Sequence, residues 1–572
     1  MTSSPADHSS DLQVLRDVLT SVAILDAVHD SDSLHAILYR CQQILDIKLL
    51  PGTGSQRPLL IVVSGGTNVG KSSLLNWLAD APLSPVSALA RGTRSPVAIG
   101  SGAVLDAFME SGAIPGVRMV RDRDAREAVD EPSAPVMFLV ETAAFSQEWI
   151  LLIDSPDVDS DHDGNRIWAG KLLDLADAVI LVVTPEKYND AAIVQFLDAA
   201  VELNRTTLAV FNKSEGTESF DDFRTNVLLS RIPNTGCLAI PRYPPKSQVQ
   251  NGDIDAVRKQ IRKMSDNERG IREKSEEGSR VLLASLCHDL ADGLAIQVEW
   301  VRDVHGEIDT ISDTILSRYI LQLKQEKFTE FDRVFALLMQ QFHIAILDDI
   351  YAFVRSNVRK GYDLLRRSSG ADNEERDEAI QSRERHRAEG AAAEARNQML
   401  YLPIHVPTPI RPLVAHWIAD LDVRPVFELE RYERDVRETS ERWVREESRS
   451  ILETIGDRKG IRYLVTSAKA FLQLGSGVLS AFLTGGLSPI DAVVVPATER
   501  LAAFLIEKGI GRPYFKLRQN QFYELRRSLL KEHLDRMIFN PIRARIPDLP
   551  LDQADRIRSL AGNLTVKDEA GS

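Results

Sequence analysis

Cysteine is scarce in this 572-residue chain, and its three cysteines, Cys41, Cys237 and Cys287, lie far apart. None forms a CxxC pair or has a histidine at metal-ligand spacing, which argues against a zinc site and a disulfide framework. We interpret them as buried thiols in a reducing compartment. A basic excess is also lacking, since 83 acidic residues against 69 lysines and arginines give a formal net charge of −14. General electrostatic binding to nucleic acid is therefore not expected, and no specific nucleic-acid partner is predicted.

A secretory signal is also missing from the first residues, MTSSPADHSSD, which have no basic segment leading into an apolar one. We therefore expect a cytoplasmic protein. What is present is globular composition, 44% hydrophobic and 27% charged, in a chain too long for a single domain.

Hydrophobic patterning predicts three regions. Residues 1–54 repeat apolar side chains at helical spacing and are expected to form N-terminal helices. Residues 55–265 alternate short apolar runs with helix-length segments, which predicts an α/β domain with a mostly parallel sheet. Two of its runs, 135–141 and 148–155, are separated only by TAAFSQ, too short for a helical crossover. We expect them to form an antiparallel hairpin, which gives the sheet one antiparallel edge strand.

Residues 266–572 lose the strand pattern and are predicted to form a long all-α, stalk-like region. Within it, residues 371–399 are mostly charged residues and alanine, which indicates either a solvated helix or a mobile insertion. The apolar, glycine-rich segment 470–506 carries no charge between 470 and 490. It suits either a hairpin that dips into a membrane or a buried helix pair with close backbone approach.

The strongest motif is SGGTNVGKSSLLN, which follows the apolar run LLIVV and leads into an amphipathic segment. It satisfies G-x-x-x-x-G-K-[ST], in which backbone N–H groups wrap phosphates at a helix N-terminus. Lys71 would then reach the β- and γ-phosphates, and the Ser72 hydroxyl would bind Mg²⁺. The predicted phosphate-binding residues are Gly65, Gly66, Thr67, Asn68, Val69, Gly70, Lys71, Ser72 and Ser73.

Two later motifs indicate whether the phosphate-binding loop takes GTP or ATP. ILLIDSPD ends a strand with Asp154, where a carboxylate holds Mg²⁺ through its water shell, and LAVFNKSE ends another with Asn212 and Lys213. The order resembles the DxxG and [NT]KxD motifs of the translation-factor and dynamin-like class of GTPases. Glu215 stands where that class has the guanine-binding aspartate. The resemblance implies GTP and GDP as ligands, Mg²⁺ as cofactor and hydrolysis of GTP.

A further segment between the phosphate-binding loop and the predicted hairpin resembles dynamin-like GTPases in particular. Thr93-Arg94-Ser95-Pro96 is similar to the T-R-x-P switch of dynamin-like GTPases. The resemblance implies that Thr93 closes over Mg²⁺ and the γ-phosphate, so Ser72, Thr93 and Asp154 form the predicted metal set. Lys71, Thr93 and Thr67 are the predicted catalytic residues. The P-loop resembles that of Era-type ribosome-associated GTPases as much as that of dynamins, and the whole plan resembles bacterial dynamin-family proteins.

Three departures from the motifs affect function. Asp157 replaces the DxxG glycine, and a carboxylate beside a triphosphate is unfavourable unless it points away. Glu215 offers guanine the same carboxylate on a longer stem. Val158 and Thr67 occupy the two positions where a water-orienting glutamine is common, so a catalytic group must come from elsewhere, with Arg91 and Arg94 as candidates.

The segment after Asp157 also imitates a calcium loop. Asp159, Asp161, Asp163 and Gly164 are spaced as in the first half of an EF-hand. Gly170 stands at the position of the bidentate glutamate, and we therefore expect no calcium site.

Three hypotheses of function follow. The first is a dynamin-like GTPase that self-associates through its GTPase domain and contacts lipid through 470–506, peripherally at the inner face of the membrane. The second is a soluble regulatory GTPase that acts on a protein or ribonucleoprotein partner. The third is a degenerate scaffold that binds GTP without turnover.

Overall fold

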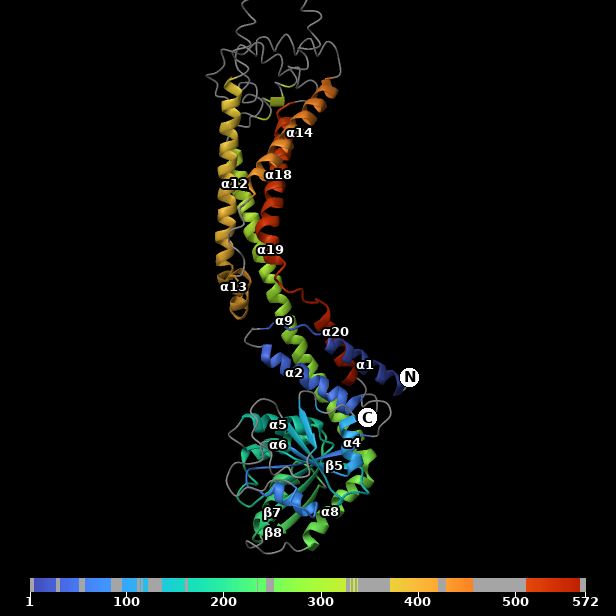
Figure 1. The fold of residues 1–572 in the computed structure, drawn as a ribbon. Coiled ribbons are helices and arrows are strands. Elements are labelled where there is room, and N and C mark those ends of the chain that lie inside the picture. The colour runs from blue at the N-terminus through green and yellow to red at the C-terminus, as the bar shows by residue number, and fades with distance from the viewer. Residues whose placement is uncertain are drawn as a thin grey trace, which may run out of the picture. The chain divides into compact units, whose positions relative to one another are not determined.

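The computed structural model (Figure 1) divides into two compact units, residues 1–298 with 549–572 and residues 299–548. Each unit is described by itself. The described residues are 5–26, 31–50, 57–83, 95–110, 114, 117–121, 136–159, 163–233, 235–242, 251–325, 330, 333–334, 337, 371–419, 428–455 and 511–565.

Unit 1 contains a sheet of eight described strands in the order β3-β4-β2-β5-β1-β6-β7-β8. All neighbouring strands pair in parallel except β2 and β5, and the mostly parallel α/β fold is confirmed. The strands are β1 (Leu59–Gly65), β2 (Val97–Gly100), β3 (Arg118–Arg121), β4 (Val136–Glu141), β5 (Ile150–Asp154), β6 (Ala178–Val183), β7 (Thr206–Ser214) and β8 (Gly236–Pro241).

The predicted hairpin of β4 and β5 is wrong in its pairing. The short strand β2 lies between them, parallel to β4 with Val97 opposite Phe138 and antiparallel to β5 with Val97 opposite Asp154. The antiparallel partner of β5 is therefore an interior strand and not an edge strand. The connection from 142 to 149 spans two strand spacings, about 10 Å, which this many residues easily cover.

Helices cover both faces of the sheet, because alternate strand residues point to opposite faces. Leu60 and Val62 of β1 pack in one core with α4, α5 and α6, while Ile61 and Val63 pack in the other with α3 and α8. The helices and helical turns are α3 (Lys71–Leu78), α4 (Gly102–Glu110), α5 (Asp163–Leu175), α6 (Ala191–Glu202), α7 (Glu218–Asp222), η3 (Phe223–Leu228) and α8 (Asn251–Asp266).

A helical core in unit 1 joins the two ends of the chain. It contains α1 (Pro5–Thr20), α2 (Ser31–Gln43), the turn η1 (Ile44–Leu49), the first part of α9 (Glu268–Gln325) and α20 (Gln553–Thr565). Their apolar side chains form one buried cluster that includes Cys41 and Cys287. All three cysteines are free, and Cys237 is half-buried. The predicted boundaries after 54 and 265 stay predictions.

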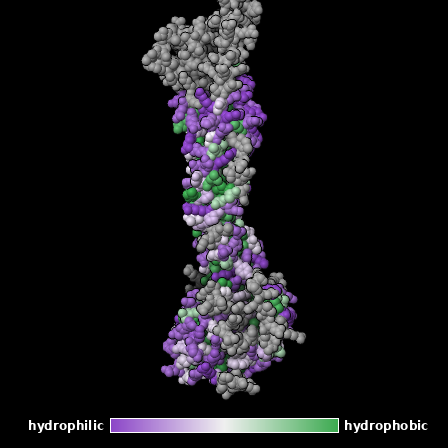
Figure 2. Space-filling view, turned by 60° about the vertical axis from the view of Figure 1, so that its left-hand side comes forward, coloured by the Kyte–Doolittle hydropathy of each residue, from purple (hydrophilic) through white to green (hydrophobic). Residues whose placement is uncertain are grey.

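The described residues of unit 2 are helical, as predicted for this region, and hydrophilic side chains cover much of its coloured surface in Figure 2. The 371–399 segment belongs to a helix whose residues Ala388, Ala392 and Ala395 are buried, so it is neither wholly solvated nor an insertion. Besides the second part of α9, the elements are α12 (Ala371–His405), η4 (Thr408–Ile410), α13 (Arg411–Ala419), α14 (Leu429–Ile455), α18 (Arg512–Leu534), η6 (Asp535–Phe539) and α19 (Asn540–Arg543).

Among the described residues, α9 is the helix long and apolar enough to cross a membrane by length and composition. Of its most apolar 18-residue window, 44% is buried inside the protein. A soluble core helix passes the same test, and α9 contributes to the buried cluster of unit 1. The segment 470–506 lies outside the described residues.

A buried ionic cluster lies in unit 1 around Asp177, just before β6. Arg57 donates to its carboxylate at 2.7 and 3.0 Å, Lys48 of η1 also pairs with it, and the Leu60 N–H donates at 2.9 Å. Lys48 additionally donates to the Ser275 hydroxyl of α9 at 2.6 Å. Asp177 and Lys48 are fully buried. Burial alone would raise the pKa of Asp177, but the charges of Lys48 and Arg57 outweigh it and hold the pKa far below its ordinary range.

A second buried polar cluster lies in unit 2 around Glu384 of α12. Its carboxylate accepts hydrogen bonds from Tyr319 of α9 at 2.6 Å and Tyr432 of α14 at 2.7 Å. Arg526 of α18 and Arg387 of α12 each approach it at 2.8 Å. Burial by itself would raise the pKa of Glu384, but the arginines and tyrosines outweigh that effect and lower the pKa to about 2. Four helices thus meet at one carboxylate.

Candidate functional site

The phosphate-binding loop has the backbone that its glycines permit. Gly65 and Gly70 adopt φ values of 153° and 99°, which side-chain-bearing residues rarely adopt. A Cβ at Gly65 would lie 2.2 Å from the Val182 carbonyl oxygen, and one at Gly70 would lie 2.4 Å from Asn212 Nδ2. The chain leaves β1 at Gly65 and enters α3 at Lys71, so the loop ends at a helix N-terminus that favours anions.

The predicted magnesium residues Ser72 and Asp154 meet in the structure. The Ser72 hydroxyl donates to Asp154 Oδ2 at 2.6 Å. Asp154 ends β5, which pairs in parallel with β1, so it lies at the same edge of the sheet as the loop that leads from β1 to Ser72 in the first turn of α3. Hydroxyl and carboxylate oxygens are the donors that Mg²⁺ prefers, and the pair fits that ion together with nucleotide phosphates. Thr93, the third predicted ligand, and Arg91 and Arg94 lie outside the described residues.

The predicted guanine-binding motif contacts the phosphate-binding loop. Asn212 Nδ2 donates to the Val69 carbonyl at 2.8 Å, and Lys213 Nζ donates to the Asn68 carbonyl at 2.6 Å. Lys213 has a positive φ of 57°, and its N–H donates to the Asn212 side chain at 2.9 Å. The two motifs therefore hold one another in place although 143 residues separate Asn212 from Val69.

Glu215 lies at an exposed position beside the end of β8. Its carboxylate pairs with Arg242, and the Arg242 N–H donates to the Ser214 carbonyl at 3.1 Å. Residues 236–242 therefore run beside the NKSE motif. The role of Glu215 in reading guanine stays a prediction.

Lys71 contacts a residue that the motif alone does not predict. Its ammonium pairs with Asp157, the residue in place of the DxxG glycine, and donates to the carbonyls of Gly65 and Gly66 at 3.1 and 2.9 Å. Both Lys71 and Asp157 are buried. Asp157 therefore points into the phosphate-binding loop. We had expected a carboxylate at this position to be compatible with a triphosphate only if it pointed away from the loop.

Asp159, from the segment after β5, contacts a second part of the phosphate-binding loop. Its Oδ1 accepts hydrogen bonds from the Thr67 N–H at 2.6 Å and the Thr67 hydroxyl at 2.7 Å, and Lys187 donates to Oδ2 at 2.5 Å. Burial raises the pKa of Asp159, but the hydrogen bonds from Lys187 and Thr67 lower it below its ordinary value. In the sequence, Asp159 stands out only through its EF-hand-like spacing, and no motif marks Lys187 as part of the site. Ser73 lies in the first turn of α3.

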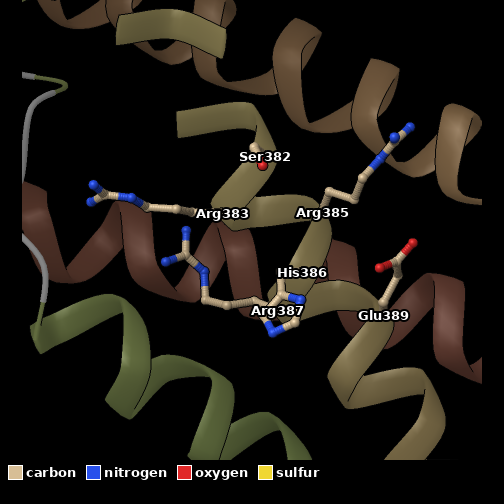
Figure 3. A pocket seen from close by; sticks show the side chains of 6 residues that line it. All are labelled: Ser382, Arg383, Arg385, His386, Arg387 and Glu389. Carbon is tan, nitrogen blue, oxygen red and sulfur yellow. The ribbon is translucent and has the colours of Figure 1, made fainter. Parts of the chain in front are cut away.

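A polar hollow of about 460 Å³ on α12 of unit 2 is unrelated to these motifs (Figure 3). Two of its arginines are already paired, Arg385 with Glu433 and Arg387 with Glu384. Its lining residues are Ser382, Arg383, Arg385, His386, Arg387 and Glu389.

Comparison with known proteins gives one family match, over residues 60–213, to the model described as 50S ribosome-binding GTPase. None of the curated proteins matches the chain. Similar solved structures include a chain of an oligomerised bacterial dynamin pair, described as sensing and tethering membranes, at 10% identity and TM-score 0.39. The alignment covers 98% of this chain and 95% of that chain.

Two further solved structures match a smaller part. Era from Aquifex aeolicus bound to GDP and aluminium fluoride is 18% identical, with 36% of this chain and 56% of that chain covered and a TM-score of 0.23. A bacterial selenocysteine-specific elongation factor is 14% identical, with 37% and 29% covered and a TM-score of 0.22.

Proposed function

Residues 60–213 form a P-loop GTPase domain, and we propose that the chain is a dynamin-like GTPase that hydrolyses GTP to GDP and phosphate with Mg²⁺. One observation carries the proposal. Asn212 and Lys213 of the base motif contact Val69 and Asn68 of the phosphate loop, so sugar, base and phosphates would lie along one edge of the sheet.

Each motif residue then has a role in holding the nucleotide. The loop N–H groups and Lys71 bind the β- and γ-phosphates, and Asn212 and Lys213 brace the loop while Glu215 accepts hydrogen bonds from guanine. Ser72, Asp154 and Thr93 would hold Mg²⁺, which neutralises charge on the phosphates. Thr67 would lie beside the site of phosphoryl transfer but lacks the amide with which a glutamine orients water, so we expect slow unstimulated turnover.

Turnover in this proposal is coupled to the helical region. Helix α9 is one 58-residue helix whose first part belongs to unit 1 and whose second part belongs to unit 2. Self-association through the GTPase domain would stimulate hydrolysis, and the apolar segment 470–506 would contact lipid at the inner face of the membrane. The T-R-x-P resemblance at 93–96 and the uncharged stretch 470–490 support this part.

Two alternatives have their own support. The matched family is described as ribosome-binding, which favours a soluble regulatory GTPase with a ribonucleoprotein partner. The pairing of Asp157 with Lys71 favours a scaffold that binds nucleotide without turnover.

The first test measures binding and hydrolysis of GTP and ATP by the purified chain over a series of protein concentrations. Lys71→Ala is expected to lower GTP turnover about 100-fold or more, because it removes the phosphate-binding cation. Lys259→Ala, an exposed lysine on α8, is the matched control and should leave turnover unchanged.

The outcomes separate the alternatives. A specific rate that rises with concentration supports stimulation by self-association, whereas tight GTP binding without turnover supports the scaffold. A preference for ATP would overturn the assignment of Asn212, Lys213 and Glu215. Co-sedimentation with anionic liposomes that is lost in Phe482→Glu would support lipid contact, and lipid indifference would favour the soluble regulator.

A further inference from the structure

Two carboxylates of one short segment, 155–159, contact the groups that bind nucleotide phosphates. Asp157 pairs with Lys71, the lysine of the motif, and Asp159 accepts from the backbone N–H and hydroxyl of Thr67 at 2.6 and 2.7 Å. The Val158 N–H between them donates to the Gly65 carbonyl at 3.3 Å. The segment is therefore fastened to the phosphate-binding loop by its backbone and by both side chains.

The contacts match those that a phosphate would make. A carboxylate, like a phosphate, presents anionic oxygens to ammonium and N–H donors. The two aspartate side chains are only 10% and 7% exposed, so water cannot replace these partners without movement of the segment. Lys187 neutralises Asp159 from the other side at 2.5 Å.

A triphosphate and a diphosphate make different demands on this arrangement. Lys71 serves both the β- and the γ-phosphate, so both nucleotides contact it, but only the γ-phosphate of GTP would take the place that Asp157 now holds on its ammonium. A γ-phosphate would also bring negative charge beside the buried carboxylate of Asp157, which then must move or remain unpaired at high cost. GDP lacks that phosphate and leaves more room for Asp157 to keep its contact.

We propose that Asp157 is a specificity-determining residue that shifts the preference of this chain from GTP toward GDP by occupying the place of the γ-phosphate on Lys71. Asp159 adds to this effect at Thr67. The γ-phosphate of GTP displaces Asp157 from Lys71, and release of phosphate after hydrolysis lets Asp157 return while Lys71 still contacts the β-phosphate of GDP. The inference rests on the proposed binding of guanine nucleotides.

Equilibrium binding of GTP and of GDP to the full chain, with Mg²⁺, tests the proposal through the ratio of the two Kd values. Asp157→Asn removes the charge and keeps the size and shape of the side chain. Asp157→Gly restores the glycine of the DxxG motif. Both are expected to lower the Kd for GTP about tenfold and to change that for GDP less than about threefold. Asp159→Asn should act in the same direction by about threefold. Asp106→Asn, an exposed aspartate of α4, is the control for loss of one charge.

Equal changes for GTP and GDP, or weaker binding of GTP, would overturn the proposal. An effect of Asp157→Gly that Asp157→Asn lacks would also overturn it, because backbone freedom and not charge would then be responsible. Variants that bind GTP where the parent binds only GDP would support it most strongly. If neither the parent nor any variant binds guanine nucleotide, the proposed function itself fails, and the inference fails with it.

Discussion

Both units of this protein bury a carboxylate, but they neutralise it in different ways. Asp177 in unit 1 is surrounded by the full charges of Lys48 and Arg57, and its partners lie at the ends of strands and in helical turns. Glu384 in unit 2 shares its charge between arginines and two tyrosine hydroxyls, and its partners lie inside four helices. Asp177 also accepts from two neutral donors, the Leu60 N–H at 2.9 Å and the Ser275 hydroxyl at 3.2 Å. Both neutral donors of Glu384 are tyrosine hydroxyls, at 2.6 and 2.7 Å.

The difference teaches where a single substitution is most costly. Removal of one charge from a fully buried ion cluster leaves its partners unpaired in a medium that solvates them poorly. At Glu384, the two tyrosine hydroxyls keep short hydrogen bonds to the side chain after such a loss, whereas at Asp177 the loss leaves the fully buried Lys48 without a counter-charge. We therefore expect unit 1 to be more sensitive than unit 2 to equivalent changes.

The largest effect is expected for Asp177→Asn, which leaves Lys48 and Arg57 without a counter-charge. The free energy of unfolding should fall by about 3–5 kcal/mol, measured by urea unfolding with hydrogen exchange to locate the change in unit 1. Glu273→Ala breaks the exposed pair with Arg269 on α9 and should cost less than about 0.5 kcal/mol. Similar losses in the two variants would show that burial of the cluster does not matter.

Glu384→Gln should lower the free energy of unfolding by about 3 kcal/mol at neutral pH, because the pKa of Glu384 falls from 4.5 to about 2 on folding. A depressed pKa stabilises the folded state above about pH 4.5, and this stabilisation disappears as the pH falls toward 2. The gap between parent and variant should therefore close in that window. A gap that is independent of pH would mean that the Glu384 charge contributes nothing.

The smallest effect concerns two glycines of α9, one in each unit. A Cβ at Gly278 would lie 2.1 Å from the Leu203 carbonyl oxygen in the turn after α6. Gly278→Ala should therefore push α9 away from that turn and lower the free energy of unfolding by about 1–3 kcal/mol. A Cβ at Gly306 would meet no atom of the described residues within 4 Å beyond its own stretch of helix, so Gly306→Ala should raise the free energy of unfolding by about 0.5–1 kcal/mol through helix propensity. Thermal unfolding of both variants measures the two effects. A higher melting temperature for Gly278→Ala would contradict the predicted clash with Leu203.

Sequence patterns predicted the fold class because each rests on neighbouring residues. The P-loop lies between β1 and α3 as predicted, and the described part of unit 2 is helical. The pairing of β4 with β5 was wrong because β2, a strand of only four residues, gives too short a pattern to be recognised. Residues 371–399 look solvated in composition because charged residues hide the alanines that pack inward.

The sequence by itself determined that a P-loop lies between an apolar strand and a helix, because glycine conformations and motif spacing are local properties. Only the tertiary structure decided what surrounds that loop. Asp157 reaches Lys71 across 86 residues, Asp159 reaches Thr67 across 92, and Lys48 reaches Asp177 across 129. Such contacts depend on how strands order themselves in the sheet, and no spacing along the chain encodes that order.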